Sequence, residues 1–168
     1  LDNLRRPRFG NTKPEGDKAV IWVSLIEKAW AKLCGNYENI IMGTVDMGFI
    51  HLCGVPSVSY KHQEYKNKAD ALFNALKMGH SKKHIMTAGT ADSTKAIEQV
   101  MGTGLVANHC YSILSMHELT VKGKKVKILK LKNPYGGGSV WKGSWGPASD
   151  LWTDALRKEV GDDAGTSK

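Results

Sequence analysis

Two short apolar segments flanking a lysine- and glycine-containing turn constrain the fold of this 168-residue chain more than any other feature. Residues 112–114 and 126–131 have the length and composition of strands, and the Lys-Gly-Lys sequence at 122–124 is a turn signal. If the chain folds back between Lys122 and Gly123, antiparallel partners have residue numbers that sum to about 245. His109 then lies opposite the segment just past Asn133, and a single β-bulge would align the two.

This pairing would place an imidazole beside a carboxamide at the open end of a hairpin. The amide oxygen of Asn133 can accept the imidazole N–H of His109 and fix its tautomer, which leaves the other ring nitrogen to take a proton from a nucleophile. These two groups are two thirds of a Cys-His-Asn catalytic triad. The alternative is a structural histidine, but the later Asn-Pro-aromatic-Gly sequence and paired tryptophans favour a catalytic role.

Three motifs in register resemble the second half of the protease core of calpains, and the resemblance extends over roughly residues 21–156. The helix expected around residues 25–38 is similar to the one with which that half begins. The motifs are Gly104 with His109, Tyr111 and Ser112; Asn133, Pro134, Tyr135 and Gly136; and Trp141, Gly143 and Trp145. Their order and spacing together are far more specific than any one motif alone.

The resemblance implies an α+β fold, with a barrel-like antiparallel β-sheet core of the papain type flanked by helices. It implies that His109 is a general base and that Asn133 orients it for peptide-bond hydrolysis. Three aromatic residues, Tyr135, Trp141 and Trp145, are expected to shield this pair from water.

The same resemblance places the nucleophilic cysteine on an N-terminal subdomain of the same protein, which these 168 residues do not include. That Cys-bearing subdomain and protein substrates are therefore the expected partners, and this chain alone should not hydrolyse peptides. Cys34 and Cys53 are interpreted as small apolar residues. Cys110 directly follows His109 in a strand and should point to the opposite face, which makes it a poor nucleophile.

Charge and cysteine content exclude several other classes of protein. Three cysteines without a Cys-x-x-Cys pair argue against a disulfide framework or a structural zinc site, and they favour a reducing, cytoplasmic compartment. The net charge of +8 allows electrostatic contact with nucleic acid or acidic lipid, but no recognition motif indicates specific nucleic-acid binding. No apolar run is long enough to cross a membrane, and the sequence does not favour membrane binding.

No metal site is predicted in this chain. His80 and His84 are four residues apart, but Gly79 is expected to end the preceding helix and no third ligand is evident, so they are interpreted as surface residues. Animal calpains bind calcium through carboxylates in the segment with the paired tryptophans, whereas residues 137–150 contain only Asp150. The usual ligands are not evident here, and calcium binding elsewhere in a full-length protein is left open.

The remaining sequence divides into a lead-in loop or linker at 1–16, a protease-core subdomain at 17–160, and a polar tail at 161–168 that is consistent with truncation. Within the subdomain, helices are expected from about 17 to 34, 66 to 78, 92 to 102 and 152 to 160, with a strand at 85–88. Residues 43–56 should form loops with a short helix or strand.

Two alternatives to a protease core remain. A calpain-like module without peptidase activity could serve as a regulatory or protein-interaction domain, and the upstream sequence would reveal it by lacking the cysteine. A basic binding domain would instead show salt-dependent affinity for DNA, RNA or acidic lipid.

Overall fold

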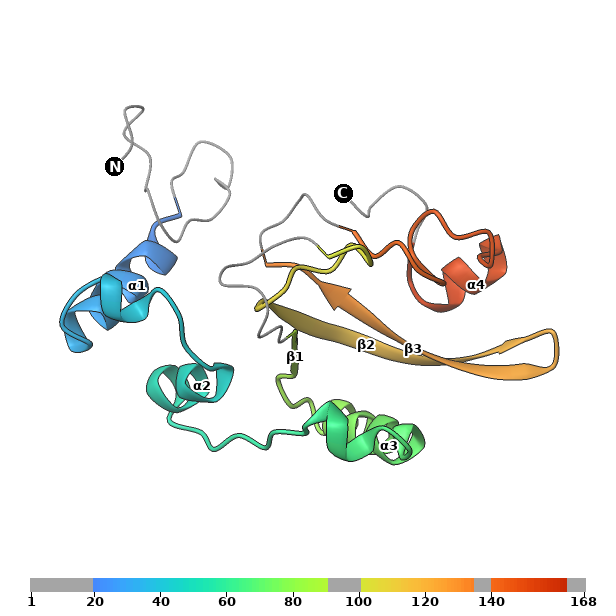
Figure 1. Ribbon diagram of the computed structural model, residues 1–168, viewed down its shortest axis with the longest axis horizontal. Coiled ribbons are helices and arrows are strands. Elements are labelled where there is room, and N and C mark those ends of the chain that lie inside the picture. The colour runs from blue at the N-terminus through green and yellow to red at the C-terminus, as the bar shows by residue number, and fades with distance from the viewer. Residues whose placement is uncertain (1–19, 91–100, 135–139, 163–168) are drawn as a thin grey trace. The chain divides into compact units, whose positions relative to one another are not determined.

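The computed structural model describes residues 20–90, 101–134 and 140–162 (Figure 1). The chain divides into two compact units, Leu1–Val58 and Ser59–Lys168. The lead-in loop predicted at 1–16, most of the helix predicted at 92–102 and most of the tail predicted at 161–168 lie outside the described residues. In the described part of the chain, no helix is both long enough and apolar enough to cross a lipid bilayer.

The first unit is helical. Helix α1 spans Trp22–Leu33, and Gly35 follows it with a φ of 102°, the left-handed conformation that the sequence predicted for this glycine. A 3-10 turn, η1 (Glu38–Ile40), leads to α2 (Val45–Cys53), the short helix expected between residues 43 and 56. Gly54 ends α2 in a left-handed conformation because glycine carries no side chain to oppose it.

The second unit begins with the 3-10 helix η2 (His62–Tyr65) and helix α3 (Ala69–Ser81). The predicted end of this helix at Gly79 was wrong, because α3 continues for two further residues. A Cβ at Gly79 would come within 3.3 Å of the Met86 sulfur, so glycine here permits close approach of the following segment. His80 and His84 are both exposed, as expected.

Three antiparallel strands follow in the order β1-β2-β3, namely β1 (Thr87–Gly89), β2 (Cys110–Val121) and β3 (Lys124–Lys132). Strand β1, which overlaps the strand predicted at 85–88, pairs with the beginning of β2. The turn between β2 and β3 has positive φ at both Lys122 and Gly123, the conformation that matches the twist of a tight hairpin. The sequence located this turn correctly.

The register of the hairpin also agrees with the sequence prediction. Partner numbers sum to 245 from Val121↔Lys124 to Ser115↔Lys130, and a bulge then shifts the sum to 244 at Ile113↔Leu131. The bulge adds one residue to β2, as predicted, but one bulge does not bring His109 and Asn133 into register, because their numbers sum to 242. Their side chains meet beyond the ends of the two strands.

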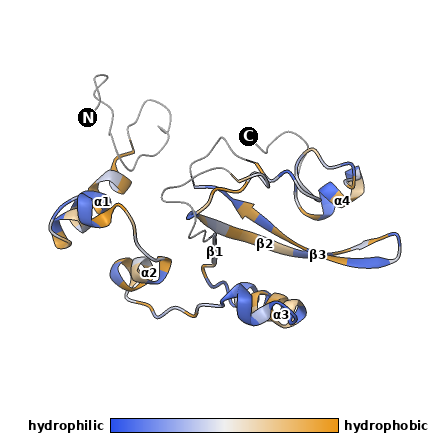
Figure 2. Ribbon diagram, in the orientation of Figure 1, coloured by the Kyte–Doolittle hydropathy of each residue, from blue (hydrophilic) through white to orange (hydrophobic). Residues whose placement is uncertain are grey.

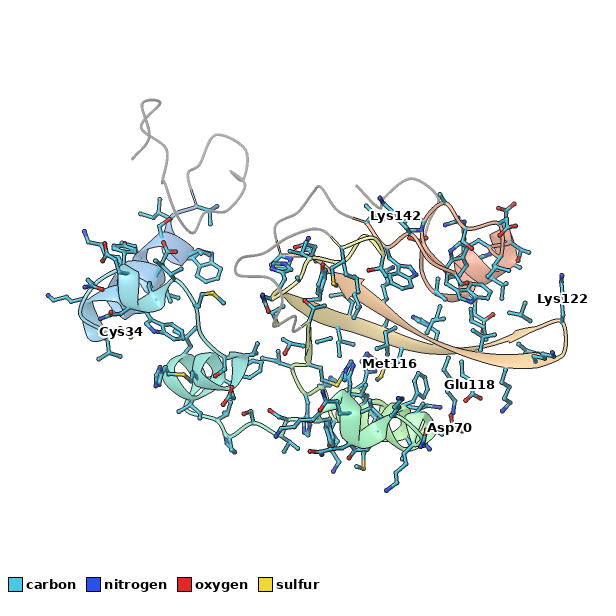
Figure 3. The ribbon with its side chains drawn as sticks, in the orientation of Figure 1. Cys34, Asp70, Met116, Glu118, Lys122 and Lys142 are labelled. Atoms are coloured by element: carbon cyan, nitrogen blue, oxygen red, sulfur yellow. The ribbon has the colours of Figure 1, made fainter. Side chains whose placement is uncertain are left out.

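The hairpin runs between α3 and α4 (Asp154–Glu159) in Figure 1. Thr153 caps α4 by accepting a hydrogen bond from the Leu156 amide. The buried apolar residues of this unit come largely from β2 and the segment before it, and include Val106, Ala107, Tyr111, Ile113 and Leu119. The turn end of the hairpin is hydrophilic (Figure 2), and Lys122 projects from it (Figure 3).

The α+β class is confirmed, but the barrel-like arrangement is not supported. Among the described residues, the three strands form an open sheet with β1 and β3 at its edges. Closure needs a further strand joining the two edges, and none occurs in residues 20–90, 101–134 or 140–162.

Candidate active site

His109 and Asn133 meet at the open end of the β2-β3 hairpin. His109 is the residue before β2 and Asn133 is the residue after β3, so the fold brings together two groups 24 positions apart. The imidazole Nε2 lies 2.9 Å from the Asn133 side-chain oxygen. His109 is buried, with 7% of its surface exposed, and Asn133 is half-buried.

This contact determines which ring nitrogen of His109 can act as a base. The amide oxygen of Asn133 has no proton to give, so Nε2 carries the hydrogen and donates it. In the neutral ring Nδ1 is then the unprotonated nitrogen, the one whose lone pair can accept a proton. The pair thus has the acid-base chemistry expected of a histidine oriented by an amide.

Tyr111 supports both the imidazole and the loop that precedes it. Its ring packs edge-to-face against the His109 ring, with centroids 5.0 Å apart and planes at 89°. Its hydroxyl oxygen accepts a 2.9 Å hydrogen bond from the Val106 amide. Tyr111 was interpreted from the sequence as a packing residue, and the structure adds this hydrogen bond to the loop.

The loop before His109 also contacts the segment that begins the paired-tryptophan motif. Gly104 has a φ of 87°, and a Cβ at this position would overlap the Val140 carbonyl oxygen. The Lys142 amide donates a 2.9 Å hydrogen bond to the Thr103 carbonyl. The first glycine of the His109 motif is therefore required where two distant parts of the chain approach closely.

Thr90 is a residue of this site that sequence reasoning missed. It directly follows β1 and hydrogen-bonds to the backbone of His109 through both its amide and its hydroxyl. The sequence gives little indication that Thr90 belongs to the site, because a threonine at the end of a strand is common. Only the pairing of β1 with β2 places it beside the histidine.

The sequence matches a known protein family over most of its length. The sequence model of the calpain family cysteine proteases matches residues 10–166. The chain belongs to the calpain family. It is 30% identical to Calpain clp-4 of Caenorhabditis elegans over 86% of this chain, and 36% identical to Calpain-12 of Homo sapiens over 84% of this chain. It is 27% identical to the Calpain-type cysteine protease DEK1 of Zea mays over 92% of this chain.

These matches concern only part of each calpain. The chain covers 20% of the nematode protein, 19% of the human protein and 7% of the maize protein. Family membership therefore supports a thiol protease domain, and the activity of a whole calpain is a separate proposal.

Trp141 and Trp145 belong to the calpain-like motif, and their contacts order the loop that contains them. The Trp141 indole donates a 2.9 Å hydrogen bond to the Ser144 carbonyl, although 41% of the residue is exposed. Trp145 is half-buried and packs edge-to-face on Trp152, with ring centroids 4.9 Å apart. These contacts do not test the predicted shielding of His109 and Asn133, which stays a prediction. Tyr135 lies outside the described residues.

The segment with the paired tryptophans does not contain the several carboxylates with which animal calpains bind calcium. Hard calcium coordination uses six to eight oxygens, usually including more than one carboxylate. Residues 137–150 contain one carboxylate, Asp150, together with the cationic Lys142. Across the described ranges, no group of three or more His, Cys, Asp or Glu residues could hold a metal ion.

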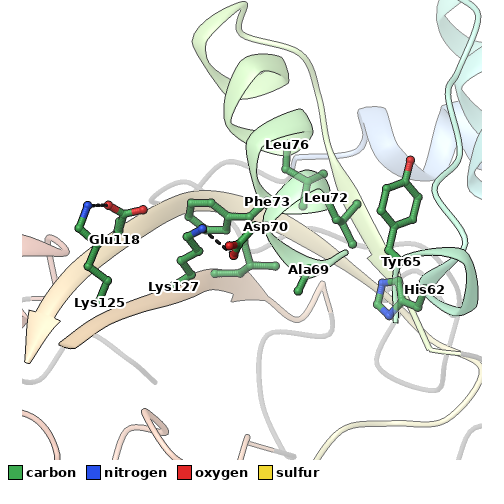
Figure 4. A pocket seen from close by; sticks show the side chains of 11 residues that line it. His62, Tyr65, Ala69, Asp70, Leu72, Phe73, Leu76, Glu118, Lys125 and Lys127 are labelled. Atoms are coloured by element: carbon green, nitrogen blue, oxygen red, sulfur yellow. Dashed lines mark hydrogen bonds and ion pairs between the residues drawn. The ribbon is translucent and has the colours of Figure 1, made fainter. Parts of the chain in front are cut away.

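A groove of about 710 Å³ lies between α3 and the hairpin, and neither His109 nor Asn133 lines it. Its apolar surface includes Leu72, Phe73 and Leu129. At the rim, Lys127 pairs with Asp70 at 2.7 Å and Lys125 pairs with Glu118 at 2.9 Å (Figure 4). The groove is thus lined by apolar side chains and ion pairs, whereas the other site consists of the His109 imidazole and the Asn133 amide.

Proposed function

We propose that this chain is the His- and Asn-bearing half of the catalytic core of a calpain-like cysteine endopeptidase. The observation that carries the proposal is the 2.9 Å contact between His109 Nε2 and the Asn133 side-chain oxygen. The family match over residues 10–166 supports it, because cysteine proteases of this family act on peptide bonds. The proposal includes a papain-type barrel, in which further strands would join the open sheet of β1, β2 and β3.

In the proposed mechanism His109 acts twice. Nδ1 first takes the proton of a cysteine thiol, giving a thiolate-imidazolium pair, and the thiolate attacks the scissile carbonyl carbon. The imidazolium then donates its proton to the leaving amine as the peptide C–N bond breaks. Asn133 accepts the Nε2 hydrogen throughout and keeps the ring aligned.

The thiol nucleophile belongs, in this proposal, to an N-terminal subdomain of the same protein. That subdomain and protein substrates are the proposed partners, and neither a cofactor nor specific nucleic acid is assigned to this chain. Cys34, Cys53 and Cys110 are free thiols, which supports a reducing compartment such as the cytoplasm. Membrane binding is not assigned to this segment.

The test compares the 168-residue chain with the longer protein that contains it, using a denatured protein substrate and a fluorogenic peptide. We expect hydrolysis by the longer protein, its loss after thiol alkylation, and none by the chain alone. A longer protein that folds and binds partners but does not cleave either substrate would favour the non-peptidase calpain-like module. Turnover by the chain alone would contradict the assignment of the nucleophile to another subdomain.

A further inference from the structure

The pairing of β1 with β2 continues one residue beyond the strands themselves. Partners in the ladder are Thr87↔Ser112, Ala88↔Tyr111 and Gly89↔Cys110, so the next opposed pair is Thr90 and His109. The Thr90 amide donates a 2.9 Å hydrogen bond to the His109 carbonyl, as an antiparallel hydrogen-bonded pair requires.

The second hydrogen bond of this pair departs from the regular pattern. In a regular ladder the His109 amide would donate to the Thr90 backbone carbonyl. Instead it donates to the Thr90 hydroxyl oxygen at 3.1 Å. The side chain of Thr90 therefore replaces a backbone acceptor at the point where the chain leaves β1.

The same hydroxyl also reaches the loop that leads into His109. Its oxygen lies 2.5 Å from the Val106 carbonyl oxygen and 3.1 Å from that of His109, so its single proton is donated to the Val106 carbonyl at the shorter distance. The Val106 amide is in turn held by the Tyr111 hydroxyl. Thr90 and Tyr111 thus fix the backbone of the loop from two sides.

We infer that Thr90 is a positioning residue for the catalytic histidine. It holds the amide and the carbonyl of His109 at once, and it acts on the imidazole through this backbone. His109 lies before the first residue of β2, so its own strand holds it less completely than an interior residue. A small displacement of His109 would change the alignment of Nδ1 with a thiol, and alignment strongly affects rate. This inference rests on the proposed protease function.

A matched pair of substitutions separates the hydroxyl from the shape of the side chain. Thr90→Val keeps the branched shape and removes the acceptor and donor, whereas Thr90→Ser keeps the hydroxyl and removes a methyl group. In the 168-residue chain, amide hydrogen exchange at His109 and the nitrogen chemical shifts of its ring report the backbone and the tautomer directly. We expect Thr90→Val to speed exchange at His109 by about 10-fold or more and to weaken the single-tautomer signature, while Thr90→Ser retains both.

In the longer protein, we expect Thr90→Val to lower kcat by about 10- to 100-fold with little change in KM, because alignment is lost rather than substrate binding. Thr90→Ser should restore most of the rate. Exchange at Leu119, which is fully buried in the same strand, distinguishes this local effect from general unfolding.

Native exchange and ring signals at His109 in Thr90→Val would overturn the inference, as would equal losses in the Val and Ser variants. Normal turnover by Thr90→Val, alongside an inactive His109→Ala protein, would overturn the inference and leave the proposed function standing. Turnover retained by His109→Ala would instead overturn the proposed function, and the inference with it.

Discussion

The contact between His109 and Asn133 shows how far residue types and their spacing predict the candidate site. Their distances from the hairpin turn predicted that they lie near one another, because antiparallel pairing converts sequence separation into position. The contact itself is made by their side chains, since one bulge leaves the two residues out of register. Their catalytic roles depend on a thiol that these residues do not supply, and those roles stay a prediction.

Asn133→Ala in the longer protein should lower kcat by about 10-fold or more, because the Nε2 hydrogen loses its acceptor and the ring its orientation. The loss should be smaller than that of His109→Ala, since the base itself is retained. Asn133→Asp is the matched variant, because it keeps an acceptor oxygen at the same position. Equal losses in the Ala and Asp variants would argue that the hydrogen bond is not what matters.

Gly104 and Gly123 offer a second comparison between single residues. Both have positive φ, but a Cβ at Gly104 would overlap the Val140 carbonyl, whereas a Cβ at Gly123 would meet nothing within 4 Å. Gly123→Ala should lower the unfolding free energy by about 1 kcal/mol, and Gly104→Ala by at least about 3 kcal/mol. Urea unfolding of the chain measures both, and equal values would contradict the close contact at Gly104.

The contact of Thr90 with His109 could not be predicted from the sequence. Its hydroxyl matters because it lies opposite His109 in the β1-β2 register, and that register follows from how two separate strands align. A short strand such as β1 carries too few residues to fix its alignment by an apolar pattern alone.

At the scale of elements, the hairpin was the most predictable part of the fold. Its turn residues and its two apolar segments were evident because each is a local property. One bulge was predicted and one is found, but it does not bring His109 and Asn133 into register. The end of α3 was not evident, since the close approach of Met86 to Gly79 is a tertiary contact. Gly79 was predicted to end the helix, but it lies within α3, where it permits the close approach of Met86.

His117 on β2 makes the stability of this hairpin depend on pH. Burial is the main cause that lowers its pKa below the ordinary value of 6.5, the charge of Lys130 adds to the decrease, Glu159 opposes it, and His80 adds further. Its Nε2 also lies 2.8 Å from the Ser115 hydroxyl. The folded state therefore favours the neutral ring.

Because the pKa of His117 is lower in the folded state, its contribution to stability is complete above about pH 6.5 and is lost as pH falls through the lowered value. When the pH is lowered from 7.5 to 5, the unfolding free energy of the His117→Gln variant should therefore fall by less than that of the native chain. Chemical unfolding at a series of pH values measures this difference. Parallel curves for the two proteins would contradict it.

At the scale of the whole molecule, the chain corresponds to only part of the calpains that it matches. It spans about a fifth of the length of Calpain clp-4 and of Calpain-12, and its described strands form an open sheet. Sequence motifs identified the family, but whether the sheet closes depends on strands that these motifs do not contain. This is why the α+β class could be predicted and the barrel could not be established.

The central claim is that His109 is the general base of a calpain-like core. It is tested most directly by measuring kcat/KM of the longer protein with His109 replaced by alanine, with thermal unfolding as the check that the variant is folded. We predict a loss of at least about 1,000-fold with the fold retained. A folded His109→Ala protein that cleaves substrate at the native rate would contradict the account.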